Sequence, residues 1–357
     1  MPRKSSGLDP LEQSALPPRP ATIDDVAKLA GVARTTVSRV LNNLPNVRPA
    51  VQEKVRAAMS ELGYEADPGA RALASGGRNT IALISSIDLE GQPDSYYHAA
   101  LEVGAMRSCF RTGHHLATHR IPEQSSTKSD AVMAIAGRGR VGLILAPPFS
   151  EDPDLLALLV ANGNPICAIA PGMATRNVAS VAIDDFLAGE AAAQHLCELG
   201  HAHLGFIAGR ETHRSTERRL SGFREGLDKA GLGPDRLMLV RDDISFAAGA
   251  RGLAKLTEEH PSITAIMCAN DDVASGAVFA AHEHGIAIPD RLSIMGFDDT
   301  PLSSTIWPAL TTVRQPIQEM AERAADLVTS GPTNSTVLLP HRVITRASTG
   351  PAPSPAT

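Results

Sequence analysis

The sequence predicts an α/β protein in which an all-α N-terminal head precedes a body of parallel sheets flanked by helices. Residues 22–62 carry dense helix signals and no strand pattern. From Ile81 onward, apolar runs alternate with amphipathic stretches of helical length, such as Ala188 to Leu199, which is typical of βαβ units. The eight apolar runs that we interpret as strands cover 81–85, 115–119, 141–146, 165–170, 178–183, 204–209, 264–269 and 292–297. This many strands favours two sheets.

Composition divides the 357 residues into five predicted segments. A Pro-, Ser- and charge-rich extension at 1–20 and a tail at 350–357 are expected to be disordered. Between them lie a helical head at 21–66, a hinge and linker at 67–79, and the α/β body at 80–349.

Bulk composition indicates a soluble, cytoplasmic protein with a basic head. No run approaches the roughly 20 apolar residues of a membrane-spanning helix, and the first 20 residues lack the apolar core of a secretory signal. Four scattered cysteines without a C-x-x-C pair fit a reduced compartment. The net charge is −6, but residues 1–78 hold 11 Lys and Arg against 8 Asp and Glu, whereas the remainder holds 22 against 31. A basic head on an acidic body suits a chain whose head alone meets phosphate.

Residues 22–62 are expected to form three helices with a tight turn between the first two. Thr22 can cap the first helix, and Gly31 can end it. The second helix turns apolar residues inward and leaves a polar outward face of Arg34, Thr35, Ser38 and Arg39. This is the helix-turn-helix plan, whose second helix enters the major groove of DNA. A three-helix bundle whose polar residues only meet water would show the same pattern.

The head resembles that of the lactose-repressor/galactose-repressor (LacI/GalR) family of transcription regulators. The family signature A-G-V-x-x-x-T-V-S-R-V-L-N is present from Ala30 to Asn42. The resemblance implies that Arg34 and Thr35 read base edges and that Arg39 contacts a guanine, the usual partner of a bidentate Arg. The residues that it places on the DNA backbone are Thr22, Thr36, Ser38, Asn42 and Tyr64.

Residues 67–76 occupy the position of this family's hinge helix. Asp67 and Pro68 are good helix-start signals. The resemblance implies that Leu73 wedges into the minor groove, with Ala70 also at the DNA. A solvated linker with one stray leucine is the alternative. Because Gly69 costs about 1 kcal/mol in a helix, we expect the hinge helix to be stable only when paired on DNA.

The body carries no motif that supports catalysis, and neither a cofactor nor a metal is expected. The G-x-G-x-x-G at 137–142 precedes an apolar run, so it lacks the strand–turn–helix order that cradles phosphate. The histidine pairs His201/His203 and His282/His284 are expected in solvated helix-to-strand loops without a third ligand.

The body resembles the same family from about Thr80 to Thr349, through stretches such as IPDRLSIMGFDDT. The resemblance implies a fold like the periplasmic sugar-binding proteins, with lobe 1 at about 80–183 and 315–342, and lobe 2 at about 184–314. A small effector would lie in the cleft between the lobes. The residues placed at the effector are Tyr96, Asp184, Arg219, Ile244, Asn270 and Asp298.

Several of these assignments have a structural alternative. Arg219 can form a surface ion pair, and Asp298 or Asn270 can cap a helix. One tyrosine of the pair Tyr96 and Tyr97 is expected in the core. Ile244 stands where relatives often carry an aromatic that stacks on the ligand, which makes a purine or an ordinary stacked hexose less favoured. Carboxylates beside an arginine favour a sugar or sugar derivative, with a nucleoside or purine as the alternative.

We therefore expect a homodimeric repressor that binds a near-palindromic operator in double-stranded DNA under effector control, without a membrane partner. A solute-binding protein for import would need a signal sequence and no helix-turn-helix. An enzyme would need a catalytic constellation that we do not find. A nucleoid-type DNA binder would leave the large body unexplained.

Overall fold

The computed structural model describes residues 21–41, 47–64, 79–87, 95–122, 127–137, 141–173, 177–330 and 334–354. The chain divides into two compact units, Met1–Ala74 and Ser75–Thr357, which we call the head and the body. The predicted extension at 1–20 and all but the last residue of the predicted hinge and linker at 67–79 lie outside the described residues. Among the residues described, no helix has the length and apolar character needed to cross a membrane.

The head contains the three predicted helices, α1 (Ile23–Ala30), α2 (Arg34–Leu41) and α3 (Pro49–Glu61). Thr22 and Asp25 form a capping box, because each side chain accepts a hydrogen bond from the other's backbone N–H. Gly31 ends α1 in the left-handed conformation at φ 65°, which lets the chain turn sharply into α2. Val26, Val37 and Val55 lie at the centre of the core that joins the three helices.

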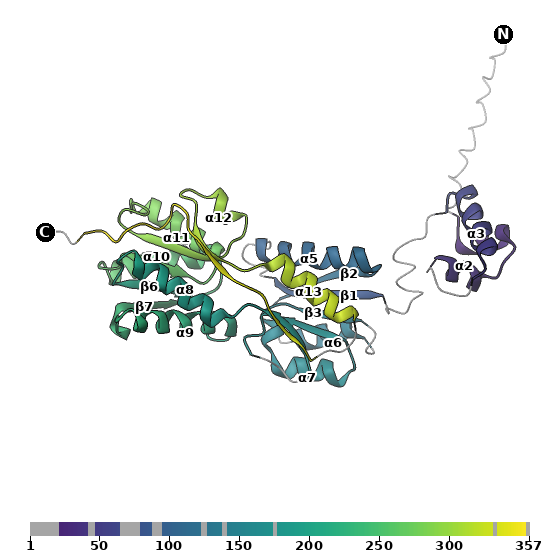
Figure 1. The fold of residues 1–357 in the computed structure, drawn as a ribbon, viewed down its shortest axis with the longest axis horizontal. Coiled ribbons are helices and arrows are strands. Elements are labelled where there is room, and N and C mark those ends of the chain that lie inside the picture. The colour runs from purple at the N-terminus through teal and green to yellow at the C-terminus, as the bar shows by residue number, and fades with distance from the viewer. Residues whose placement is uncertain are drawn as a thin grey trace, which may run out of the picture. The chain divides into compact units, whose positions relative to one another are not determined.

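Lobe 1 of the body is a six-stranded parallel sheet covered by helices on both faces (Figure 1). Helices α5 (Tyr96–Thr112) and α13 (Ile317–Thr329) pack on one face, and α6 (Lys128–Ala136) and α7 (Pro153–Ala161) on the other. The strands, in spatial order, are β11 (Thr336–Leu338), β5 (Ala179–Ala182), β4 (Ile166–Ile169), β3 (Gly142–Leu145), β1 (Thr80–Ile87) and β2 (His115–Pro122).

Lobe 2 repeats this plan. Helices α8 (Asp185–Glu198) and α9 (Arg214–Lys229) cover one face of its sheet, and α10 (Phe246–Glu259) and α11 (Asp271–Glu283) cover the other. The strands, in spatial order, are β12 (Arg342–Ile344), β10 (Thr311–Arg314), β9 (Ser293–Asp298), β8 (Ala265–Cys268), β6 (Leu204–Ala208) and β7 (Leu237–Arg241). The short elements are η1 (Phe149–Glu151), η2 (Pro234–Arg236) and α12 (Leu302–Thr305).

All eight predicted strands are present, and the predicted fold class is confirmed. Strands β7, β10, β11 and β12 were not predicted. Strands β10, β11 and β12 have only three or four residues and lack a long apolar run, whereas β7 contains the apolar run 237–240, which we did not interpret as a strand. Strand β11 is mostly exposed. Strand β12 pairs antiparallel with β10, so the prediction of a wholly parallel second sheet is wrong at this edge. Strands β7, β11 and β12 lie at sheet edges, which bury less surface and therefore leave a weaker pattern in the sequence.

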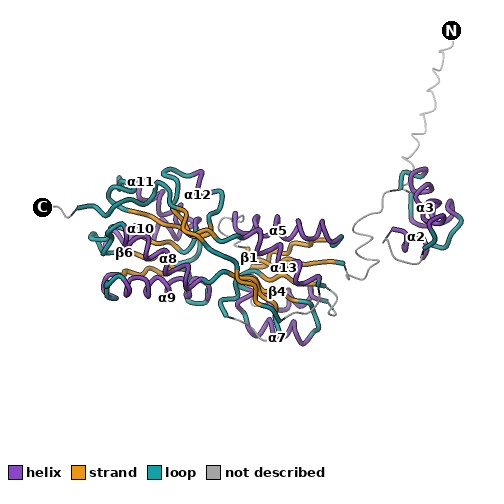
Figure 2. Tube along the Cα trace, in the orientation of Figure 1, coloured by secondary structure: helices purple, strands orange, loops and turns teal. Residues whose placement is uncertain are grey.

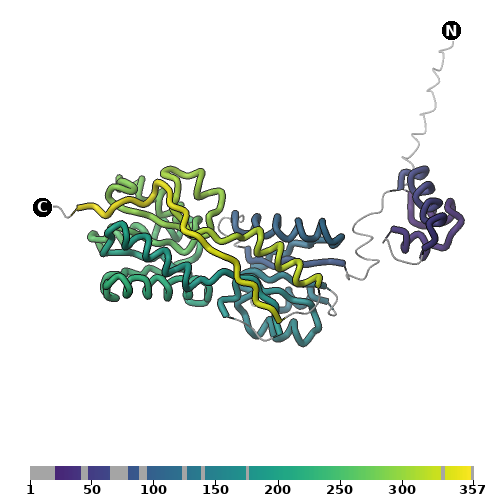
Figure 3. The backbone as a smooth tube through the Cα atoms, viewed as in Figure 1, coloured from purple at the N-terminus to yellow at the C-terminus, as the bar shows by residue number. Residues whose placement is uncertain are grey.

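The chain crosses between the lobes three times, after β5, after β10 and after β11 (Figure 2). The last crossing carries the C-terminal segment from lobe 1 along lobe 2 (Figure 3). There the Ala352 amide donates to Leu199 O at 2.8 Å, and the Gly350 amide donates to Ser293 Oγ at 3.1 Å. The predicted disorder of 350–357 is therefore wrong as far as Ala352, because lobe 2 supplies hydrogen-bond partners for this segment.

Neighbouring helices in the body approach one another at glycines. A Cβ atom on Gly189 of α8 would lie 2.0 Å from Arg219 O of α9, and one on Gly222 would lie 1.8 Å from Phe186 O. Helices α10 and α11 meet in the same reciprocal way at Gly249 and Gly276. Because only hydrogen fits at these positions, the glycines determine how close the helices lie.

Candidate functional site

The outward face of α2 is the candidate DNA-reading surface. Arg34, Thr35 and Arg39 are exposed on it, as predicted, whereas Thr36 and Ser38 are partly buried at its margin. Arg34 Nη1 lies 3.4 Å from Asp24 Oδ2 in an ion pair whose two side chains are both largely exposed. A pair of this kind contributes little to stability, so the guanidinium can exchange it for a base edge or a phosphate.

The remaining head residues that were predicted to contact DNA either stabilise the fold of the head or lie outside the described residues. Thr22 caps α1, and its hydroxyl donates to Asp25 Oδ2 at 2.7 Å. Tyr64 is partly buried against the core of the head. The other three, Asn42, Ala70 and Leu73, lie outside the described residues.

In the body, four charged side chains from both lobes act electrostatically on the Tyr97 hydroxyl, and we call these five residues the interlobe cluster. Tyr97 and Glu151 come from lobe 1, and Asp185, Arg219 and Asp298 come from lobe 2. Burial raises the pKa of the Tyr97 hydroxyl, and the negative charges of the three carboxyl groups raise it further, whereas the Arg219 guanidinium lowers it. The pKa of Tyr97 in lobe 1 thus depends on charged side chains of both lobes, so the two lobes share an electrostatic site.

Arg219 is the buried centre of this cluster. Its Nε donates to Asp185 Oδ1 at 2.8 Å, and the two side chains are only 8% and 3% exposed. Its Nη1 donates to Ala269 O at 3.1 Å, and its guanidinium carbon lies 3.7 Å from the centroid of the Phe297 ring. The surface ion pair considered for this arginine is therefore wrong, because the pair is buried and held in one orientation.

Asp298 ends β9 in a strained conformation. Its φ is 105° and that of Asp299 is 56°, values that non-glycine residues rarely adopt. This turn directs Asp298 toward Gln315, whose Nε2 donates to Asp298 Oδ1 at 2.5 Å, while Asp299 accepts from Arg346 at 2.6 Å. Burial, above all, raises the pKa of Asp298 to about 7, with Asp272 and Asp185 contributing. No helix begins at Asp298, so it is not a cap.

Two hydrogen-bonded contacts join the lobes beside the cluster. Glu151 accepts from the backbone N–H groups of Arg214 at 3.1 Å and Ser215 at 2.9 Å, so a carboxyl group of lobe 1 caps helix α9 of lobe 2. Burial raises the pKa of Glu151, against the opposing effect of these N–H groups. The Ser95 hydroxyl donates to Asp272 Oδ2 at 3.1 Å, from α5's N-cap to α11.

The other predicted effector residues lie differently. Asp184 caps α8 and Asn270 caps α11, each by accepting backbone N–H bonds. Tyr96 is 47% exposed, so the structure places Tyr97 rather than Tyr96 at the cluster. Ile244 packs against the core of lobe 2 and lies close to Gly209, where an added Cβ would be 2.9 Å from it.

The four histidines considered for metal binding were predicted to lie in solvated loops, and this prediction is wrong for two of them. His201 is buried, and its ring nitrogens make hydrogen bonds with Thr264, Ser293 and Gly350 O. His282 lies on α11 and bonds the carbonyl of Trp307 at 2.9 Å. Within the described ranges, no group of three or more His, Cys, Asp or Glu is placed to hold a metal ion.

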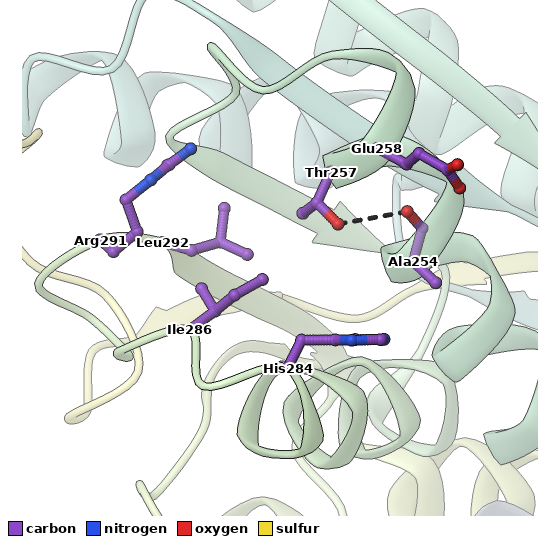
Figure 4. Close-up of a pocket in the computed structure, with 7 residues that line it drawn as sticks. All are labelled: Ala254, Thr257, Glu258, His284, Ile286, Arg291 and Leu292. Atoms are coloured by element: carbon purple, nitrogen blue, oxygen red, sulfur yellow. Dashed lines mark hydrogen bonds between the residues drawn. The ribbon is translucent and has the colours of Figure 1, made fainter.

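Lobe 2 also carries a surface hollow of about 410 Å³ (Figure 4). Its lining residue Leu292 directly precedes β9, so the hollow lies at the end of this strand opposite Asp298. Arg291 lies at its edge but donates to the carbonyls of Ile263 at 2.7 Å and Pro261 at 2.5 Å. Thr257 likewise bonds the carbonyls of its own helix. Arg291 and Thr257 thus bond only backbone carbonyls of lobe 2, whereas the interlobe cluster combines charged side chains from both lobes and is the better candidate for a ligand site.

The comparisons with known proteins agree with this geometry. A family model described as "Bacterial regulatory proteins, lacI family" matches residues 22–67, and one described as "Periplasmic binding protein-like domain" matches residues 193–349. The HTH-type transcriptional regulator GalR of Escherichia coli (strain K12) is 30% identical over 309 residues, covering 86% of this chain and 88% of GalR.

Two solved structures extend the match over both units. A lac repressor dimer bound to operator and the anti-inducer ONPF matches with a TM-score of 0.75 at 25% identity, covering 93% of this chain and 100% of that one. A complex of the transcriptional regulator CelR with cellobiose matches with a TM-score of 0.69 at 27% identity, covering 92% and 99%. The predicted resemblance is confirmed, and the chain belongs to the LacI family of DNA-binding transcriptional regulators.

Proposed function

We propose that the protein represses transcription in the cytoplasm by holding a near-palindromic operator with the two α2 helices of a homodimer. This proposal rests mainly on one observation. Arg34, Thr35 and Arg39 are exposed together on α2, the helix that follows the turn at Gly31. Arg39 reads a guanine, and the segment containing Ala70 and Leu73 enters the minor groove. The protein acts by binding, without catalysing a reaction.

The proposed effector is a sugar or sugar derivative bound at the interlobe cluster. Arg219, Asp298 and Tyr97 bring charged and polar side chains of both lobes within electrostatic reach of one another, which suits a molecule with several hydroxyl groups. The relative CelR was solved in complex with a sugar, cellobiose. An effector that binds two arrangements of the lobes unequally would change operator affinity, with a coupling of about 1–3 kcal/mol.

Selection of operator DNA from a random pool, followed by mobility-shift titration, tests the DNA-binding proposal. Arg39→Ala should lose about 1–3 kcal/mol of preference for the selected sequence. The matched control is Arg56→Ala, which removes the same charge from the exposed side of α3. It should leave the preference between sequences unchanged. Failure to enrich any sequence, or an equal loss of preference in both variants, would contradict the proposal.

A further inference from the structure

The carboxylate on Arg219 limits what this arginine can bind. Asp185 already occupies its Nε at 2.8 Å, and Ala269 O occupies Nη1 at 3.1 Å. A second anion would have to share one guanidinium with Asp185 at a buried site, where repulsion between like charges is weakly screened. The Asp185 carboxyl therefore makes Arg219 a poor receptor for a phosphate or carboxylate ligand.

The surroundings of the pair are also acidic. Asp298 and Glu151 belong to the interlobe cluster, and Asp272 bears electrostatically on Asp298. Asp185 and Asp298 both act electrostatically on Arg219, so the acidic groups of the site outnumber its one guanidinium. Such an excess of acid repels an anion and attracts a cation.

An unsatisfied acceptor lies in the same place. Gln315 is only 4% exposed, and its Nε2 is used by Asp298. Its Oε1 is buried without a hydrogen-bond partner in the part of the chain that the structure describes. A buried acceptor of this kind costs free energy until a donor reaches it, so a ligand that supplies N–H or O–H groups is favoured.

We infer that the effector is a hydroxyl-rich molecule without negative charge, that an ammonium group on it increases affinity, and that Asp185 imposes this specificity by occupying Arg219. Amino sugars and amino polyols are the class that meets all three conditions. Sugar phosphates and sugar acids are excluded. This inference rests on the proposed effector role of the interlobe cluster.

Calorimetric titration of the full-length protein with matched sugar series tests the inference. Each series holds an amino sugar, its neutral parent and its phosphate ester, for example glucosamine, glucose and glucose 6-phosphate. We expect the amine to bind most tightly and the phosphate ester at least about tenfold more weakly than the neutral parent. A phosphate ester that binds best overturns the inference, as does the absence of binding by every compound at about 10 mM, a concentration at which even millimolar affinities are visible.

Variants at Asp185 test its part separately. Asp185→Asn should improve phosphate-ester binding relative to the amine by about tenfold or more, because Arg219 regains a free charge. In Asp185→Ala, formate should raise the melting temperature by replacing the lost carboxylate, whereas it should not do so in the wild type.

The matched control for these variants is Asp326→Asn. In the wild type, the Asp326 carboxyl bonds Ser108 and Arg111 in lobe 1. The control should keep the wild-type ranking. An unchanged ranking in Asp185→Asn overturns the role of Asp185, and the wild-type ranking still tests the ligand class if this variant does not fold.

Operator affinity measured with and without each bound compound separates the two proposals. If the amine binds best but leaves operator affinity unchanged, the proposed regulatory function fails and the charge assignment stands. If operator affinity responds to a phosphate ester instead, the regulatory function stands and the inference about charge fails.

Discussion

At the scale of single residues, Asp298 combines backbone strain, burial and a shifted proton equilibrium. The positive φ at Asp298 costs of order 1–3 kcal/mol, and burial disfavours its ionised form. The Gln315 amide and the Arg219 charge oppose that effect without cancelling it. The protein thus keeps at the junction of its lobes a carboxyl group whose ionisation depends on pH near neutrality.

Asp298→Asn should flatten the dependence of stability on pH. The wild-type carboxyl keeps its proton in the folded state up to a pKa of about 7, whereas the unfolded chain releases it near the ordinary pKa of 3.8. Between these values the folded state binds more protons, so the free energy of unfolding falls as pH rises. In the variant this decrease should be smaller by up to about 1.4 kcal/mol for each pH unit, because the titrating carboxyl group is gone. Urea unfolding of the two proteins from pH 4 to pH 7 measures it, and parallel curves would contradict the assignment.

The sequence was informative about some residues of the site and silent about others. Arg219 and Asp298 were predicted by family resemblance. Asp185 was not, because it directly follows Asp184, and only the register of α8 decides which of the two caps the helix and which is buried. Glu151 lies in a single 3₁₀ turn with no periodicity to indicate that it reaches the other lobe. Contacts between segments distant in the chain leave no local pattern.

At the scale of elements, helix α9 is the part that connects the lobes most directly. Its N-terminus is capped by Glu151 from lobe 1, its second turn carries Arg219, and its backbone touches α8 at Gly189. A displacement of α9 along or away from α8 would therefore move Arg219 and alter the contact with lobe 1 together.

Gly189→Ala should destabilise the body and disturb the site. The added Cβ would lie 2.0 Å from Arg219 O, so the helices must separate, which we expect to cost about 1–3 kcal/mol. Gly233→Ala is the control, because a Cβ there meets nothing within 4 Å. Urea unfolding measures both variants. Equal stability of Gly189→Ala and the wild type would show that the helices separate without cost.

Glu151→Ala should expose two amides of the opposite lobe. The backbone N–H groups of Arg214 and Ser215 lose their acceptor, so their hydrogen exchange should accelerate by about tenfold, as expected for the loss of a helix cap worth about 1–2 kcal/mol. Asp152→Ala is the control, since Asp152 caps α7 within lobe 1 through the Leu155 amide. It should accelerate Leu155 alone. Unchanged exchange at Arg214 and Ser215 in Glu151→Ala would show that the contact does not hold the lobes together.

At the scale of the whole molecule, the body presents an apolar surface on α5 that its own fold does not cover. Val103, Met106 and Phe110 follow one another at helical spacing, and Phe110 is 91% exposed. The lac repressor that matches this chain was solved as a dimer on its operator. We propose that this face of α5 belongs to the surface between two copies of the chain.

Phe110→Glu should therefore weaken the dimer, because a carboxylate would be buried without a partner. We expect the dissociation constant to rise by about 100-fold, corresponding to roughly 3 kcal/mol. Sedimentation equilibrium measures it, with Leu158→Glu on the half-exposed side of α7 as the control. If Phe110→Glu stays dimeric at the concentration where the wild type does, this face is not the dimer surface.

The three crossings between the lobes have a consequence for synthesis on the ribosome. Lobe 1 begins with β1 but lacks α13 and β11 until residues 317–338 have been made, and lobe 2 lacks β12 until Ile344. The hydrogen bond from the Ala352 amide to Leu199 O in lobe 2 forms later still. At about 5–20 residues per second, translation of the body thus proceeds for many seconds with both lobes incomplete and apolar faces uncovered. The core between the lobe 1 sheet and α13 can therefore be completed only near the end of translation, when residues 317–329 have left the exit tunnel.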